Sequence, residues 1–173
     1  MKRIIISLFC FVAITGISVT AFAQEDKSKR PSPPAEAKGV IDGSDITVSY
    51  SSPAVKGRMI WGSLVPYGKV WRTGANEATV FETSKDIVLN GQTLPAGKYS
   101  LFTIPGENEW TIIFNSDWNQ WGAFKYNKEK DVLRLTARPD KSTSFNERLK
   151  FEVIDDEVVM YWENVKVGFP VGN

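Results

Sequence analysis

The sequence contains no histidine and a single cysteine, Cys10. Beyond Cys10, the chain therefore has none of the imidazole or thiolate ligands typical of zinc, copper, haem or iron–sulfur centres. The same absence excludes serine–histidine and cysteine nucleophiles, and also a disulfide framework. Carboxylate, lysine or tyrosine chemistry remains, as do hard cations on oxygen ligands. Because the chain also has no Asp-x-Asp-x-Asp run, we expect no metal and no cofactor.

The chain also lacks a strong net charge, with 21 basic and 20 acidic residues. Basic residues are not gathered into a stripe, and no nucleic-acid-binding motif is present. Affinity for nucleic acid depends mainly on lysine and arginine contacts to phosphate. We therefore expect no nucleic-acid partner.

The first 23 residues have the pattern of a secretory signal peptide. Lys2 and Arg3 give a positive start, residues 4–17 are an apolar run, and residues 21–23 form a small-residue cleavage pattern. The run is too short and too interrupted for a retained span of about 20 apolar residues. We expect cleavage after residue 23, export to the periplasm or the extracellular space, and no membrane span afterwards. Cleavage would leave 19 basic and 20 acidic residues, a net charge of −1.

The mature chain is expected to begin with a flexible tether over residues 24–39. This segment is rich in charged residues and proline and has no large apolar side chain to bury. Residues 40–173 are long enough for one domain with its own hydrophobic core.

Short segments of alternating polar and apolar residues follow the tether and predict strands, whereas no segment has a sustained 3.6-residue apolar period. The predicted strands cover residues 45–51, 56–64, 78–83, 86–89, 98–104, 110–114, 131–137, 148–154, 158–163 and 165–171. Asn90-Gly91 predicts a tight hairpin, and Asp155-Asp156 predicts another turn. This pattern favours a single-domain antiparallel β-sandwich or jelly roll, with a closed barrel as second choice.

Residues 64–79 (LVPYGKVWRTGANEAT) have neither a helical nor a strand period, yet they are rich in polar and aromatic side chains. Loops held by a rigid scaffold often carry function. A second irregular stretch, residues 118–130, is also rich in aromatics. The candidate ligand-binding residues from the two segments are Tyr67, Lys69, Trp71, Arg72, Asn76, Glu77, Trp118, Trp121 and Tyr126.

Each candidate also has a purely structural interpretation. Arg72 and Glu77 can face a ligand, or they can pair with each other and fix the shape of the loop. Asn76 can bind a ligand or stabilise a turn. The tryptophans and tyrosines can stack on a ligand or pack in the core. Lys69 can steer an anion or be solvated. Glu129 and Asp131, near Tyr126, can accept a proton or a cation, or they can be solvated loop charges.

The motifs together resemble a secreted bacterial family known as domain of unknown function 2911, common in Bacteroidetes. The resemblance is carried by Leu64–Thr79, Leu94–Phe102, Trp110–Asn115, Gln120–Gly122 and Asp131–Arg134. It extends over roughly residues 39–171, and the first motif is the most specific. The resemblance implies no activity, because none is established for the family.

Export, together with loop aromatics beside Asn, Arg and Glu, favours non-catalytic binding of a carbohydrate or another small polar molecule. One alternative is a carboxylate-dependent hydrolase or lyase in which Glu77 is the catalytic acid or base. A glycosidase of this type would need a second carboxylate across a cleft. The other alternative is a structural or interaction module of a secreted assembly.

Overall fold

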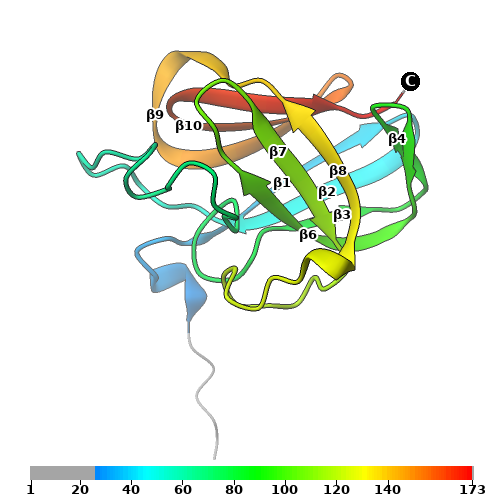
Figure 1. Ribbon diagram of the computed structural model, residues 1–173, viewed down its shortest axis with the longest axis horizontal. Helices are drawn as coiled ribbons and strands as arrows, with labels where there is room; N and C mark the ends of the chain where they lie inside the picture. The colour runs from blue at the N-terminus through cyan, green and yellow to red at the C-terminus, as the bar shows by residue number, and fades with distance from the viewer. Residues whose placement is uncertain (1–25, 173) are drawn as a thin grey trace, which may run out of the picture.

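Antiparallel strands dominate residues 26–172, the part of the chain that the computed structural model describes (Figure 1). The predicted signal peptide lies outside these residues. The elements are η1 (Lys27–Lys29), β1 (Pro34–Ile41), β2 (Ser44–Ser51), β3 (Val80–Thr83), β4 (Ile87–Leu89), β5 (Gln92–Leu94), β6 (Gly97–Ile104), β7 (Trp110–Asn115), η2 (Lys128–Lys130), β8 (Asp131–Ala137), β9 (Asp140–Ile154) and β10 (Glu157–Pro170). Within residues 26–172, no helix is long and apolar enough to cross a membrane.

Six strands form the main sheet in the order β1-β2-β3-β6-β7-β8, and all neighbours are antiparallel. The hairpins β4–β5 and β9–β10 are separate two-stranded sheets. Asn90 and Gly91 connect β4 to β5 with φ values of 50° and 75°. Both residues of a type I′ turn need positive φ, so the structure confirms the predicted hairpin.

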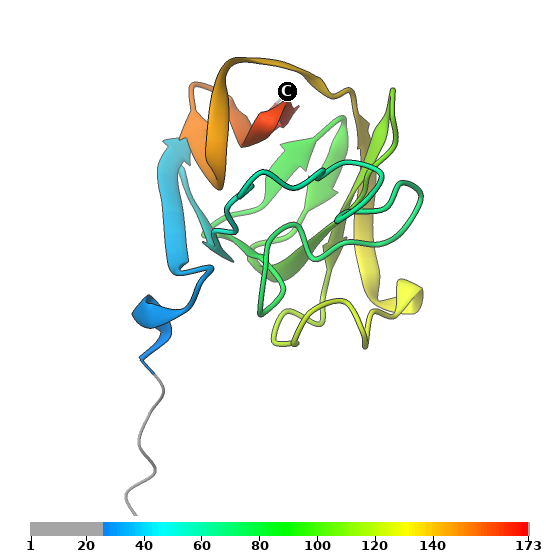
Figure 2. The ribbon, with the colours of Figure 1, turned by 90° about the vertical axis from the view of Figure 1, so that its left-hand side faces the viewer.

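The long hairpin β9–β10 lies over one face of the six-stranded sheet (Figures 1 and 2). From β10, Phe169 contacts both Phe81 of β3 and Phe114 of β7, with ring centroids 6.1 and 5.5 Å apart. One hydrophobic cluster fills the space between the two layers. The predicted antiparallel β-sandwich is therefore confirmed, and the sheet is not closed into a barrel.

The opposite face of the central strands is also covered. Along β6, Leu101 belongs to the core between the layers, whereas Phe102 packs on the other face with Ile113 and half-buried Tyr126. This arrangement follows from the strand period of two, which sends successive side chains to opposite faces. The segment between β7 and β8 thus closes the outer face of the sheet.

Two predicted segments differ in the structure. The prediction of a strand over residues 56–64 is wrong, because this stretch consists of turns, with Gly57 and Gly62 at φ values of 65° and 79°. Residues 34–39, assigned to the tether from sequence, belong to β1 and pair with β2. The alternation that buries Ala37 and Ile41 was hidden by the small size of most β1 side chains.

Candidate functional site

The segment from residue 52 to residue 79 crosses between the two layers of the sandwich. Ala54 forms an isolated antiparallel bridge with Arg148 of β9, and Trp71 forms one with Thr103 of β6. The Trp71 amide donates to the Thr103 carbonyl over 2.7 Å, and the Thr103 amide donates back over 2.9 Å. The irregular candidate segment is therefore fixed to both layers.

The two loops predicted to form a site do meet. Glu77 forms a β-bridge with Trp121, and the Gly122 amide donates to the Asn76 carbonyl over 3.1 Å. The Ala78 amide donates to the Gln120 carbonyl over 3.0 Å. These contacts join the end of the first loop to the second loop through the backbone.

Glu77 is paired with the N-terminal part of the domain. Its carboxylate accepts hydrogen bonds from Lys27 Nζ at 2.9 Å and from Arg30 Nη1 at 3.0 and 3.1 Å. Partial burial opposes ionisation of this carboxyl. Hydrogen bonds from Lys27, from the backbone amide of Glu77 itself and from Arg30 outweigh that effect and lower its pKa to about 2. The suggested Arg72–Glu77 pair is therefore not formed, because Glu77 has other cationic partners.

Residues 26–33, which we name the strap, are held by the same region. Asn76 Nδ2 donates to the Ser32 carbonyl at 3.0 Å and also to Ser51 Oγ at 3.1 Å. The Ser52 amide donates to the Pro33 carbonyl over 2.8 Å. Asn76 has a φ of 57°, a conformation that asparagine tolerates well. It therefore shapes the loop and also anchors the strap.

A cleft of about 310 Å³ opens beside Arg72, and we name it the Arg72 cleft. Its lining combines the first candidate loop, the preceding turns, the strap and β10: Ser32, Pro53, Arg58, Leu64, Val65, Trp71, Arg72, Gly74, Ala75, Asn76 and Trp162. None of these lining residues is acidic. The volume is at the lower end of the roughly 300–1,000 Å³ typical of small-molecule sites.

Two buried N–H groups at this cleft have no hydrogen-bond acceptor within residues 26–172. They are Arg72 Nε and Trp162 Nε1. Burial alone lowers the pKa of Arg72, so no neighbouring acid offsets the desolvation of its guanidinium. Such an unpaired, partly buried charge is unfavourable for folding. Arg72 therefore contributes little to the stability of the fold.

Arg58 brings a second positive charge to the cleft. Its Nε donates to the Val55 carbonyl at 3.0 Å, and its Nη2 donates to the Ala54 carbonyl. These bonds fix the guanidinium against the backbone, whereas Nη1 has no partner among the described residues. Arg58 is thus a preorganised donor beside Arg72.

The predicted aromatic platform is divided between the core and the surface. Trp71 stacks on Trp162 with ring centroids 5.8 Å apart and an interplanar angle of 16°. Both rings pack against Trp61, and Trp71 also packs against Trp110. Trp71 is half-buried, and its indole N–H donates to the Gly74 carbonyl at 3.2 Å. Trp71 therefore forms a wall of the cleft and part of the core.

The other two loop tryptophans, Trp118 and Trp121, are 43% and 55% exposed and do not line the Arg72 cleft. Lys98 Nζ lies 5.5 Å from the centroid of the Trp118 ring, and the Arg30 guanidinium lies 5.8 Å from that of Trp121. Each ring thus already has a cation against it.

The remaining candidates lie away from this cleft. Tyr67 and Lys69 are exposed and are not among its lining residues. Tyr126 donates to Asp131 Oδ2 at 2.6 Å, and Arg134 binds the same carboxylate at 2.7 Å. Burial and the bond to Asp131 raise the pKa of Tyr126 to about 12. This closed network fixes the second loop to the start of β8.

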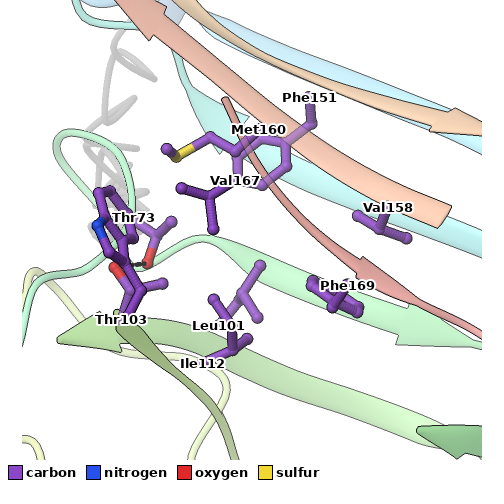
Figure 3. Close-up of a pocket in the computed structure, with 10 residues that line it drawn as sticks. Thr73, Leu101, Thr103, Ile112, Phe151, Val158, Met160, Val167 and Phe169 are labelled. Carbon is purple, nitrogen blue, oxygen red and sulfur yellow. Dashed lines mark hydrogen bonds between the residues drawn. The ribbon is translucent and has the colours of Figure 1, made fainter. Parts of the chain in front are cut away.

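A second cavity, in the interior, is much too small for a ligand. It lies between the layers, where Leu101, Ile112, Met160 and Phe169 surround a space of about 10 Å³ (Figure 3). At one end, Thr73 Oγ1 and Thr103 Oγ1 are hydrogen-bonded at 3.1 Å. A cavity of this size is at the limit for a single water molecule. The interior is therefore packed.

A hollow of about 400 Å³ beside Asn90 and Asp156 contains none of the candidate residues, and one of about 170 Å³ includes Glu77, which is already bound by Lys27 and Arg30. The Arg72 cleft gathers the most candidate residues and is therefore the candidate site.

Sequence reasoning missed Arg58 and Trp162 as cleft residues and Lys27 and Arg30 as partners of Glu77. Arg58 was placed in a predicted strand, and Trp162 in a strand expected to face the core. Lys27 and Arg30 were placed in the tether. No local pattern indicates these contacts, since they join segments far apart in the chain.

A family model described as a protein of unknown function (DUF2911) matches residues 32–171. The chain belongs to the DUF2911 family. No curated protein and no solved structure matches the chain. The match to the DUF2911 family includes both candidate loops and every residue that lines the Arg72 cleft.

Proposed function

We propose that this DUF2911 protein binds a small polar molecule non-catalytically in the Arg72 cleft. The observation that carries the proposal is the pair of buried donors, Arg72 Nε and Trp162 Nε1, which lack acceptors among the described residues. Buried polar groups in folded proteins are nearly always hydrogen-bonded. The terminal nitrogens of Arg72 are not among these buried atoms, so a ligand with acceptor atoms would give this guanidinium the partner that it lacks.

Of the two ligand classes expected from sequence, a small polar molecule fits this cleft better than a sugar bound by stacking. Trp162 is only 1% exposed, and Trp71 is half-buried with one ring face stacked on Trp162, so little ring surface is left for a sugar. A sugar held by hydrogen bonds through its hydroxyl groups remains compatible with the proposal. The supporting feature is polar donors on an apolar wall.

The hydrolase or lyase alternative receives less support. With a pKa of about 2, Glu77 is ionised at neutral pH and is a poor general acid. Lys27 and Arg30 occupy its oxygens, and Glu77 is not among the residues of the Arg72 cleft. A catalytic role for Glu77 would require the strap to move away.

We further propose that the protein works after export, in the periplasm or outside the cell. This rests on the signal-peptide pattern of the first 23 residues. Cleavage after residue 23 would leave the whole strap in the mature protein. The strap supplies Ser32 to the lining of the cleft.

A thermal-shift screen of glycans and polar metabolites tests the binding proposal. A ligand at 100 times its dissociation constant stabilises the folded state by about 2.7 kcal/mol, which raises Tm by roughly 5–10 °C. Ala75→Leu places a larger side chain in the cleft wall and should abolish the shift. Ala96→Leu, at an exposed turn outside the cleft, is the matched control. A ligand that shifts all three proteins equally would place binding elsewhere.

A further inference from the structure

The charges that line the Arg72 cleft are all of one sign. Arg58 and Arg72 supply positive charge, and no aspartate or glutamate is among the lining residues. Asn76 uses its amide N–H groups on Ser32 and Ser51 rather than on the cleft. The lining thus presents charged donors without a neighbouring counter-charge.

The acid nearest to Arg72 in the chain is held elsewhere. Glu77 follows Arg72 by five residues, but its carboxylate is bound by Lys27 and Arg30 of the strap. Glu77 is thus bound on the strap side of the loop and is not among the residues that line the cleft. The fold therefore maintains an uncompensated guanidinium at a partly buried position, which is unfavourable unless a ligand uses it.

From these contacts we propose that the ligand of the Arg72 cleft carries an oxyanion group, either a carboxylate or a phosphate; this inference rests on the proposed binding function. Arg72 binds the oxyanion through its two terminal nitrogens, which are not among the buried atoms and form a fork that matches both groups. Arg58 offers Nη1, which has no partner among the described residues. Water would satisfy the N–H groups but would leave the positive charges unbalanced.

The cleft also limits the rest of the ligand. Its volume of about 310 Å³ suits a compact molecule rather than a polymer. Leu64, Val65 and Trp71 add apolar lining to the charged donors. A small organic acid or phosphate ester, with a short apolar or neutral body, combines these properties.

Calorimetric titration with succinate, succinamide and inorganic phosphate tests this proposal. Succinate and succinamide have the same carbon skeleton, but only succinate is anionic. We expect succinate or phosphate to bind at least about tenfold more tightly than succinamide, because charge-assisted hydrogen bonds are roughly twice as strong as neutral ones. Binding of only one of the two anions identifies the type of oxyanion. Added sodium chloride should weaken binding.

Variants at Arg72 identify the group that recognises the charge. Arg72→Met should reduce oxyanion affinity at least about tenfold. Arg72→Lys should retain part of the affinity, since it keeps the charge but loses the fork. Arg138→Met is the matched control, because Arg138 is exposed and does not line the cleft. The affinity of this variant for the oxyanion should equal that of the wild type.

Three results would overturn the oxyanion proposal. The first is binding of succinamide as tight as that of succinate, abolished by Ala75→Leu; the cleft would then bind ligands without recognising charge. The second is the absence of binding by both anions at 10 mM. The third is anion binding that Arg72→Met leaves unchanged. If neutral compounds from the thermal-shift screen also fail to bind, the proposed binding function itself is wrong.

Discussion

Arg72 and Glu77 lie five residues apart in one loop, but only Glu77 has partners of opposite charge among the described residues. Glu77 receives hydrogen bonds from Lys27 and Arg30, and its pKa falls to about 2. Arg72 has a buried Nε without an acceptor in the described chain, and desolvation lowers its pKa. The first charge is compensated within the described part of the fold, whereas the second is not.

From the sequence, Arg72 and Glu77 were equivalent candidates for a structural or a ligand-binding role. The structure separates the two residues. When a charged side chain has partners inside the fold, these contacts account for its position. A charge without such partners needs another explanation, and ligand binding is the usual one where activity and stability compete. The contrast between the Glu77 contacts and the Arg72 cleft therefore predicts different responses to mutation.

The largest expected effect is at the base of the cleft. Trp162 is 1% exposed, so Trp162→Ala should lower the free energy of unfolding by about 3–5 kcal/mol in urea denaturation. Trp121→Ala, at a position 55% exposed, should lower it by less than about 1 kcal/mol. Similar losses of unfolding free energy in the two variants would show that Trp162 is not part of the stabilising core.

A smaller effect is expected at Glu77. Glu77→Gln should lower the free energy of unfolding by about 1 kcal/mol at pH 7, because the side chain is 39% exposed and solvent screens its ion pairs. Urea denaturation at low and high salt measures this loss, which should shrink as salt rises. A loss above about 3 kcal/mol would instead indicate a pair shielded from water.

The stabilisation from the contacts of Glu77 with Lys27 and Arg30 should depend on pH below about 4.5. The folded pKa of Glu77, about 2, lies below the ordinary value of 4.5, so the stabilisation is present above pH 4.5. It is lost as the pH falls from 4.5 towards 2. The stability difference between wild type and Glu77→Gln should therefore close over this interval. A difference that persists unchanged at pH 2 contradicts the assignment.

The local rules of strand formation predicted most of the fold. Alternation located β2, β6, β7 and β8 within one residue at each end, and Asn90-Gly91 located the β4–β5 hairpin. These features depend on neighbours in the sequence. The strand prediction for residues 56–64 failed because apolar side chains such as Ile60 and Trp61 reach the core from turns, which imitates a strand pattern.

The candidate site was only partly predictable for the opposite reason. The loop containing Trp71, Arg72 and Asn76 was recognised from its composition, and these three residues do line one cleft. Whether Arg72 pairs with Glu77 depends on Lys27 and Arg30, about 50 residues earlier in the chain. Sequence spacing contains no information about such competition between partners.

The smallest effect on stability, and the most informative, is expected at Arg72. Arg72→Met keeps an unbranched apolar side chain and removes a charge without a partner, so the free energy of unfolding should stay constant or rise by up to about 1 kcal/mol. The same substitution at Arg134, which binds Asp131 at 2.7 Å, should lower it by about 2 kcal/mol. Urea denaturation of both variants at pH 7 makes the comparison. If the two variants lose the same free energy of unfolding, Arg72 stabilises the fold. Its position at the cleft would then be explained by structure, without a ligand.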